Sequence, residues 1–145
     1  MRFWDASAVV PLCLEQPQTE VVKDLAKEDR QIVVWWGTLV ECHAVVARLR
    51  REGRLDPAQE GQVITLQSLS QRWTEVQPSM EVRRLAAGLV HRYPLRAADS
   101  FQLAAAYLWT GVRPHNRLFI SLDRRLRQAA LQEGFLVLPE SIPVV

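Results

Sequence analysis

Four carboxylates are the residues of this sequence best placed to do chemistry together: Asp5, Glu41, Asp99 and Asp123. Asp5 and Asp123 each come at the end of a short apolar run that is typical of a β-strand. Glu41 lies in the first helical turn after another such run, and Asp99 lies in the first turn of an alanine-rich helix. Because the carboxyl ends of parallel strands meet at one edge of a sheet, we expect Asp5, Glu41 and Asp123 to gather there. Asp99 joins them if its helix begins at the same edge.

Carboxylates that converge on one cleft repel each other unless protons or a cation offset their charge. Mg²⁺ or Mn²⁺ fits such a cleft, because these ions prefer oxygen ligands and keep water molecules for chemistry. A bound ion lowers the pKa of its water and offsets charge on a phosphodiester. The set contains no histidine or cysteine, so it predicts metal-assisted phosphoryl chemistry. Ser7 and Ser121, each two residues from an acid, are expected to donate hydrogen bonds that orient the carboxylates or a bound water.

Each acid also has a purely structural interpretation. Thr38 and Glu41 have the spacing of a capping box, in which the glutamate accepts from a backbone amide. Asp123 fits an N-cap, and Asp99 complements the dipole of its helix. Asp5 fits a turn in which it accepts backbone hydrogen bonds. These interpretations stay open for each residue alone, but they are less favoured for all four together, because the structural roles do not explain why four like charges converge.

Strand-like and helix-like segments alternate along the chain. The expected strands span residues 2–4, 32–36, 74–76, 118–121 and 135–138. Helical periodicity covers residues 21–26, 39–50, 57–73, 82–89, 96–109 and 123–133. Strands separated by helices pair in parallel through right-handed crossovers. The expected fold class is therefore α/β: a three-layer α/β/α sandwich with a central, mostly parallel sheet of about five strands.

Length and composition fit one soluble domain. The 145 residues contain no repeat or linker, so we expect a single domain over residues 1–145. With 48% hydrophobic and 23% charged residues, the chain is not of the disordered class. Cys13 and Cys42 provide neither a disulfide framework nor a metal-ligand spacing. Arg2 and Asp5 interrupt any signal-peptide core, and no apolar run approaches the roughly 20 residues of a membrane span. We therefore expect a cytoplasmic protein that does not bind a membrane.

The net charge of +2 conceals an uneven distribution of arginine. Lys23 and Lys27 are the only lysines among 18 basic residues. The segment 83–127 holds nine arginines and only two acids, Asp99 and Asp123. A basic segment around two candidate metal ligands suits binding to a phosphate backbone, although a solvated helix face would look alike. The arginines that flank the acids are the first candidates for RNA binding: Arg96, Arg124 and Arg125.

The motifs around the acids resemble those of the PIN-domain family, most closely the VapC-like toxins of bacterial and archaeal toxin–antitoxin pairs. The matching motifs are Asp5-Ala6-Ser7-Ala8-Val9-Val10, Thr38-Leu39-Val40-Glu41, the segment 93–106 around Asp99 and the segment 119–123 that ends at Asp123. Their order and spacing cover nearly the whole chain. Two departures are Ser100, where the family usually has alanine, and Cys42-His43, where small or apolar residues are commoner. Neither departure removes a ligand.

The resemblance implies a PIN-like sandwich in which Asp5, Glu41, Asp99 and Asp123 form an acidic pocket for Mg²⁺ or Mn²⁺. It implies a metal-dependent endoribonuclease that hydrolyses RNA phosphodiester bonds, and a small cognate antitoxin whose tail covers the cleft. A homodimer is also expected. A housekeeping RNA-processing PIN nuclease, and a PIN-like module that binds RNA or protein without cleavage, remain alternatives.

Other α/β classes fit the sequence less well. A haloacid-dehalogenase-type phosphatase needs a second aspartate where Ser7 stands, and a response-regulator receiver needs a late lysine, whereas no lysine follows Lys27. No glycine-rich phosphate loop supports a nucleotide-binding domain. Three tryptophans, Trp35, Trp36 and Trp109, are candidates for base stacking or a dimer interface, with core packing as the favoured role.

Overall fold

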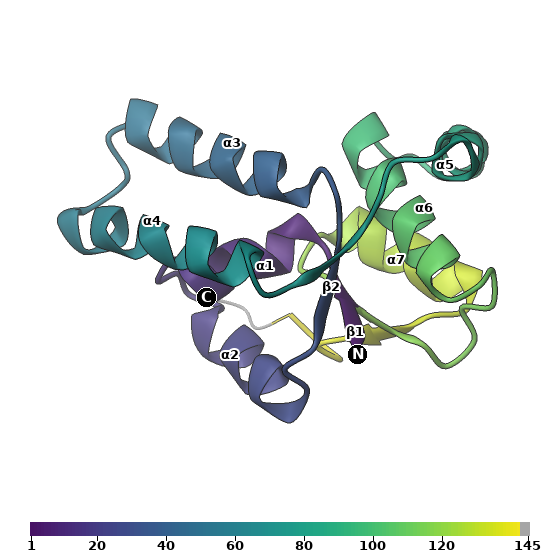
Figure 1. Ribbon diagram of the computed structural model, residues 1–145, viewed down its shortest axis with the longest axis horizontal. Coiled ribbons are helices and arrows are strands. Elements are labelled where there is room, and N and C mark those ends of the chain that lie inside the picture. The colour runs from purple at the N-terminus through teal and green to yellow at the C-terminus, as the bar shows by residue number, and fades with distance from the viewer. Residues whose placement is uncertain (143–145) are drawn as a thin grey trace.

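The structure, a computed structural model, describes residues 1–142 as an alternation of strands and helices (Figure 1). The strands of this part of the chain are β1 (Arg2–Trp4), β2 (Ile32–Trp35), β3 (Thr74–Val76), β4 (Leu118–Ile120) and β5 (Leu136–Leu138). The helices are α1 (Ala6–Cys13), α2 (Thr19–Glu28), α3 (Thr38–Arg51), α4 (Pro57–Ser70), α5 (Met80–Arg92), α6 (Ala97–Trp109) and α7 (Arg124–Glu133).

The strands form one five-stranded sheet in the order β3-β2-β1-β4-β5. Every neighbouring pair is parallel. In register, Phe3 lies opposite Val33 of β2 and Phe119 of β4, so β1 lies at the centre of the sheet. The predicted α/β class is confirmed, and the sheet is parallel throughout.

Both faces of the sheet are buried because successive strand side chains point to opposite sides. Phe3 and Val33 belong to a core shared with α5, α6 and α7. Trp4 and Val34, the next residues along each strand, belong to a second core shared with α1, α2, α3 and α4. Helices on both faces give the three layers, with the sheet between two apolar cores.

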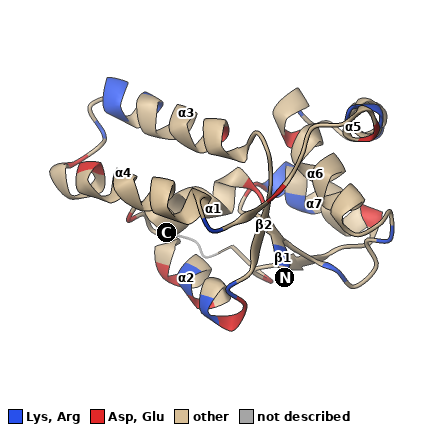
Figure 2. Ribbon diagram, in the orientation of Figure 1, with Lys and Arg blue, Asp and Glu red and all other residues tan. Residues whose placement is uncertain are grey.

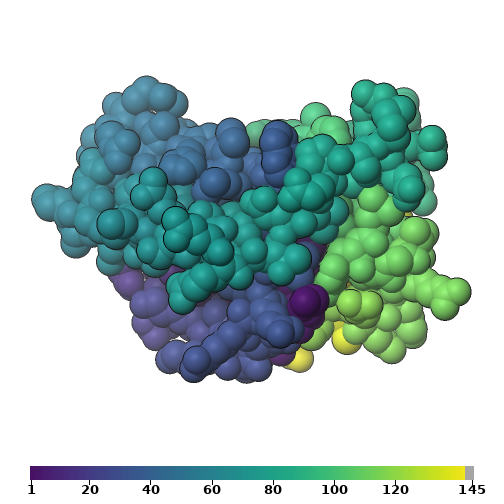
Figure 3. All heavy atoms as spheres, in the orientation of Figure 1, coloured from purple at the N-terminus to yellow at the C-terminus, as the bar shows by residue number. Residues whose placement is uncertain are grey.

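The two helical layers occupy different parts of the surface. In Figure 3 the blue-to-teal atoms of α3 and α4 cover one side of the visible face, and the green atoms of α6 cover the other. Four helices, α1, α3, α5 and α7, begin just beyond the carboxyl ends of β1, β2, β3 and β4. Within residues 1–142, no helix has both the length and the apolar character needed to cross a membrane.

Some boundaries differ from those predicted. β2 and β4 each end one residue earlier, which leaves Trp36 and Ser121 in the turns beyond the strands. Helix α1 was not among the predicted helices. It contains Pro11, which lacks the N–H group that a helical residue normally donates. Its apolar side chains are buried against the sheet, so tertiary packing stabilises this helix despite the proline.

Candidate active site

All four predicted carboxylates line one cavity of about 490 Å³ at the carboxyl edge of the sheet, here called the acidic cavity. Asp5 follows β1 as the N-cap of α1, and Asp123 follows β4 as the N-cap of α7. Glu41 and Asp99 lie in the first turns of α3 and α6. The fold therefore brings together residues that are as far as 118 positions apart in the sequence (5 and 123).

Asp5 is buried, with 3% of its surface exposed, and two serines hold its carboxylate. Ser7 Oγ donates to Oδ1 at 2.6 Å, and Ser121 Oγ donates to Oδ2 at 3.2 Å. The serine hydroxyls in turn accept hydrogen bonds from backbone amides: Leu122 N donates to Ser7 Oγ at 2.8 Å, and Asp123 N donates to Ser121 Oγ at 3.1 Å. This network fixes Asp5 against the turn that carries Asp123.

Glu41 is half-buried and is held by Gln102 of α6. The Gln102 side-chain amide donates to Glu41 Oε2 at 2.7 Å and to Thr38 Oγ1 at 2.9 Å. Gln102 is 1% exposed, and its own Oε1 has no hydrogen-bond partner among residues 1–142. The capping-box interpretation of Thr38 and Glu41 is wrong, because Gly37 is the N-cap of α3 and no side chain caps it.

The other two acids partly serve their own helices. Asp123 Oδ1 accepts from Leu126 N at 2.9 Å, so the N-cap interpretation is confirmed for this residue. Asp99 is half-buried in the first turn of α6, where its charge complements the helix dipole. Using one oxygen of Asp123 for the cap leaves its second oxygen for another partner.

Burial and mutual repulsion raise the pKa values of three of these carboxyls. Burial raises the pKa of Asp5 to about 7, the charges of Asp123 and Glu41 add to the rise, and the bonds from Ser7 and Ser121 oppose it. Burial, with the charge of Asp99, raises the pKa of Glu41 to about 7 against the opposing bond from Gln102. Burial and the charge of Asp123 raise the pKa of Asp99. The acids are therefore close enough to disfavour full ionisation without a cation.

The donor set fits a hydrated divalent ion. As the side chains lie, no group of three or more His, Cys, Asp or Glu residues in the described part of the chain could hold a metal ion by itself. Mg²⁺ does not require such a cage, because it keeps several waters and takes one or two carboxylates directly. Oxygen-only ligands, a shared cavity and carboxyls that resist ionisation together match an ion of this kind.

The three predicted RNA-binding arginines lie beside the acids. A cavity of about 390 Å³, here called the arginine cavity, is lined by Arg96, Arg124, Arg125, Ala98 and the acids Glu41, Asp99 and Asp123. It shares those three acids with the acidic cavity. Figure 2 shows blue on the first turn of α7 and red on the first turn of α3.

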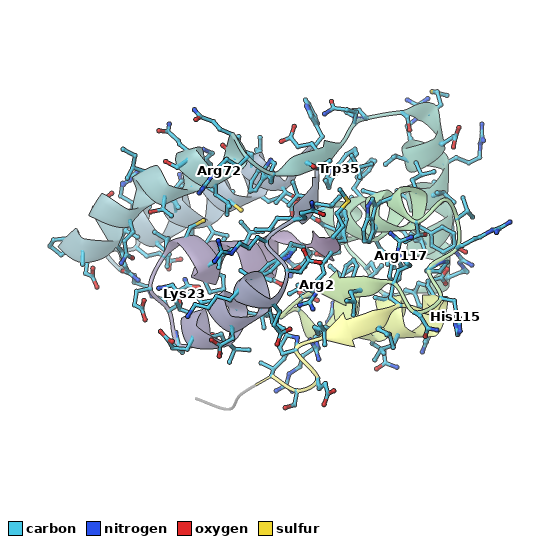
Figure 4. All side chains as sticks on the ribbon, turned by 60° about the horizontal axis from the view of Figure 1, so that its bottom comes forward. Arg2, Lys23, Trp35, Arg72, His115 and Arg117 are labelled. Atoms are coloured by element: carbon cyan, nitrogen blue, oxygen red, sulfur yellow. The ribbon has the colours of Figure 1, made fainter. Side chains whose placement is uncertain are left out.

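Other arginines of the basic segment have different positions. Arg127 is half-buried and donates to the backbone carbonyls of Ser121 at 2.6 Å and Pro139 at 2.5 Å, so it ties the turn after β4 to the segment after β5. Arg117 precedes β4, at the amino edge of the sheet, and stacks over Trp109 at 4.4 Å from the ring centre. Figure 4 shows Arg117 and His115 together at one end of the molecule. The basic segment is thus divided between both edges of the sheet.

Two residues of the site were not predicted from the sequence. Gln102 lies three positions after Asp99, on the same face of α6, and that spacing was the available signal. Arg48 lies seven positions, or two turns, after Glu41 on α3 and lines the acidic cavity. By contrast, His43 is exposed and is not among the residues that line either cavity.

The tryptophans have separate environments. Trp35 is 9% exposed and stacks on Phe101 with ring centres 5.4 Å apart, so core packing is confirmed for this residue. Trp36 is 54% exposed.

A further cavity of about 330 Å³, between α2, α4 and β2, has apolar walls with Arg30 and Arg72 but no carboxylate. Arg72, which is labelled in Figure 4 and follows the end of α4, therefore lies apart from the acids.

The fold and the cavities define an α/β protein with a carboxylate-lined cleft at the carboxyl edge of a parallel sheet. A toxin–antitoxin complex from Klebsiella pneumoniae is similar in fold, with a TM-score of 0.59 and 16% identity over 85% of this chain and 87% of that chain. FitAcB from Neisseria gonorrhoeae is similar as well, with a TM-score of 0.56 and 17% identity over 94% of this chain and 96% of that chain. No protein-family model matches the sequence, and no curated protein matches it significantly.

Proposed function

We propose that this chain is a divalent-metal-dependent endoribonuclease of the VapC-like PIN type, acting as the toxin of a toxin–antitoxin pair. The observation that carries the proposal is the acidic cavity, where four carboxylates from distant parts of the chain meet at the carboxyl edge of the sheet. Metal-dependent hydrolysis of RNA requires a site that binds a divalent ion and tolerates a phosphate backbone. The arginine cavity beside the acidic cavity supplies the positive charge that a phosphate backbone needs.

Asp5, Glu41, Asp99 and Asp123 would hold Mg²⁺ or Mn²⁺, directly or through water. Such an ion, when bound, supplies a water of lowered pKa and stabilises charge on the phosphodiester. Bonds from Ser7 and Ser121 fix both oxygens of Asp5, and the bond from Gln102 fixes one oxygen of Glu41. Fixed ligands of this kind are a general requirement of metal sites.

The serines do not act as nucleophiles in this proposal. Ser7 Oγ donates to Asp5, and no histidine lines either cavity to take its proton. Arg96, Arg124 and Arg125 bind phosphates and position the strand instead. Their charges act on the backbone and carry no base preference.

The proposed partner is a small cognate antitoxin that covers the cleft. The similar structure from Klebsiella pneumoniae is a toxin–antitoxin complex, which supports a toxin role for this chain. The resemblance of the four acidic motifs to VapC-like toxins supports the same role. The homodimer expected from that resemblance stays a prediction.

Removal of divalent ions tests the activity. The purified protein is expected to cleave single-stranded RNA in Mn²⁺ or Mg²⁺ and to stop when EDTA is added, because the carboxylates alone do not stabilise charge on a phosphodiester. Mapping of the cut ends on total RNA measures both the activity and the site preference. Cleavage that continues unchanged in excess EDTA would contradict the metal-dependent mechanism.

Gln102 is expected to position Glu41 for metal binding. Gln102→Leu removes the 2.7 Å bond to Glu41 and should raise the Mn²⁺ concentration for half-maximal cleavage about 10–100-fold. RNA affinity should change little, because Gln102 is buried and does not line either cavity. Gln132→Leu, at an exposed position on α7, is the matched control. A normal Mn²⁺ requirement in Gln102→Leu would show that the bond does not affect the metal site.

A further inference from the structure

Arg48 is a cation in the acidic cavity that the proposed mechanism does not yet use. It lies two turns after Glu41 on α3, which is about 10 Å along the helix axis. It lines the acidic cavity together with Gln16 and Val45, and none of these three lines the arginine cavity. The two cavities share Glu41, Asp99 and Asp123, so the cavity lined by Arg48 and the cavity lined by the three other arginines meet at these acids.

The guanidinium of Arg48 is available to a ligand. It is exposed, and it forms none of the salt bridges found among residues 1–142. It is not among the charges that shift the pKa of Asp5 or Glu41, whereas Arg96 and Arg125 both lower the pKa of Asp99. Arg48 therefore does not serve to neutralise the nearest acids.

We propose that Arg48 binds a phosphate of the RNA strand on the α1–α3 side of the acids, so that the strand passes through both cavities with phosphates held on each side of the bond to be cut. The inference rests on the proposed function and adds the path of the substrate. Cations at both ends and carboxylates in the middle suit a polyanion whose central phosphate meets a divalent ion. Contacts on both sides also restrict sliding of the strand, which helps align one phosphodiester with the acids.

The experiment measures RNA binding, so that its result does not depend on cleavage. In a non-cleaving Asp99→Asn background with Mg²⁺, fluorescence anisotropy gives the Kd of a labelled single-stranded RNA for the parent, Arg48→Ala, Arg48→Lys and Arg51→Ala. Arg51 is an exposed arginine on the same helix that lines neither cavity, so Arg51→Ala is the matched control.

Arg48→Ala is expected to weaken binding about tenfold at low salt and to lower the salt slope by about one. Arg51→Ala should stay within about twofold of the parent. Arg48→Lys keeps the positive charge and should recover most of the affinity, which separates the phosphate contact from local damage to α3. Shortening the RNA from the end that reaches Arg48 should weaken the parent but leave Arg48→Ala unchanged, because that contact is already absent.

Three results would overturn the inference. If Arg48→Ala binds RNA as the parent does while the wild type still cleaves, the proposed function stands and the strand path is wrong. If Arg48→Ala retains RNA affinity but loses binding of a poly-glutamate peptide, Arg48 serves an acidic protein segment instead. If the parent binds no RNA and the wild type does not cleave it, the proposed function fails together with the strand path.

Discussion

Asp99→Asn is expected to lower divalent-dependent RNA cleavage by about a thousandfold or more. Asp99 is one of three acids that line both the acidic and the arginine cavity, and it lies near the charges of Glu41 and Asp123. Asparagine has nearly the same shape but carries no charge, so it loses most of the attraction for a divalent ion. Loss of several kcal/mol of charge stabilisation in the transition state corresponds to a rate effect of that size.

The measurement is single-turnover cleavage of a labelled RNA in Mn²⁺ by wild type and Asp99→Asn, purified side by side. Asp24→Asn is the matched control, because Asp24 is exposed on α2 and lines neither cavity. The control should cleave at the wild-type rate. Equal cleavage by Asp99→Asn and wild type would indicate a contaminating ribonuclease and remove the support for the metal-nuclease proposal. The RNA affinity of Asp99→Asn, measured by anisotropy, separates loss of chemistry from loss of binding.

The stability of the metal-free protein is expected to fall as the pH rises through about 7. The pKa values of Asp5 and Glu41 are raised to about 7, whereas in the unfolded chain they are near their ordinary values of roughly 4. Between those limits the folded state binds more protons than the unfolded state, so the free energy of unfolding decreases with rising pH. The stabilisation is fully present below the unfolded pKa and is lost above the folded pKa.

For Asp5 alone, the rise corresponds to roughly 4 kcal/mol between the unfolded and the folded pKa; roughly 2 kcal/mol of this falls above pH 5.5, which is on the order of 5 °C in the unfolding midpoint. Thermal unfolding in EDTA from pH 5.5 to 8.5 measures the effect. Asp5→Asn should flatten the pH dependence and unfold at a higher temperature than wild type at pH 8.5, since asparagine retains partners for Ser7 and Ser121. Asp24→Asn should follow the wild-type curve.

Divalent ions should restore the stability that the wild type loses at high pH. At pH 8.5, Mn²⁺ is expected to raise the unfolding midpoint because it binds the ionised carboxylates of the folded state only. Asp5→Asn should respond much less. A wild-type midpoint that rises with pH from 5.5 to 8.5 in EDTA would contradict the coupling between burial and ionisation on which this prediction depends.

The fold was predictable because strand and helix periods are distinct in this sequence. Ile32 to Trp35 is apolar at every position, as expected for a strand covered on both faces. Helix α1 was missed because Pro11 argues locally against a helix, and only the packing of its neighbours on the sheet decides otherwise. Strand ends were misplaced by one residue since local pattern does not show where pairing with the next strand stops.

The candidate site was partly predictable for a different reason. The positions of Asp5 and Asp123 follow from the rule that parallel strands end at one edge, and the structure brings both into one cavity with Glu41 and Asp99. Gln102 was missed because an amide in an alanine-rich helix looks like a solvent-facing residue until the fold brings its side chain to Thr38 and Glu41 in the first turn of α3. The division of the arginines also required the fold, because Arg117 and Arg124 are close in sequence but lie at opposite ends of β4.

Because β1 lies at the centre of the sheet, the site around Asp5 is completed late in synthesis of the chain. The Asp5 amide donates to the carbonyl of Ile120 at 3.0 Å, and the bond from Ser121 to Asp5 spans 116 residues. On the ribosome, Asp5 of the nascent chain therefore lacks its bonds to Ile120 and Ser121 until residues up to 123 have emerged. Contacts so distant in sequence also form late in folding. Throughout that period the message under translation and the ribosomal RNA beside it face an incomplete cleft.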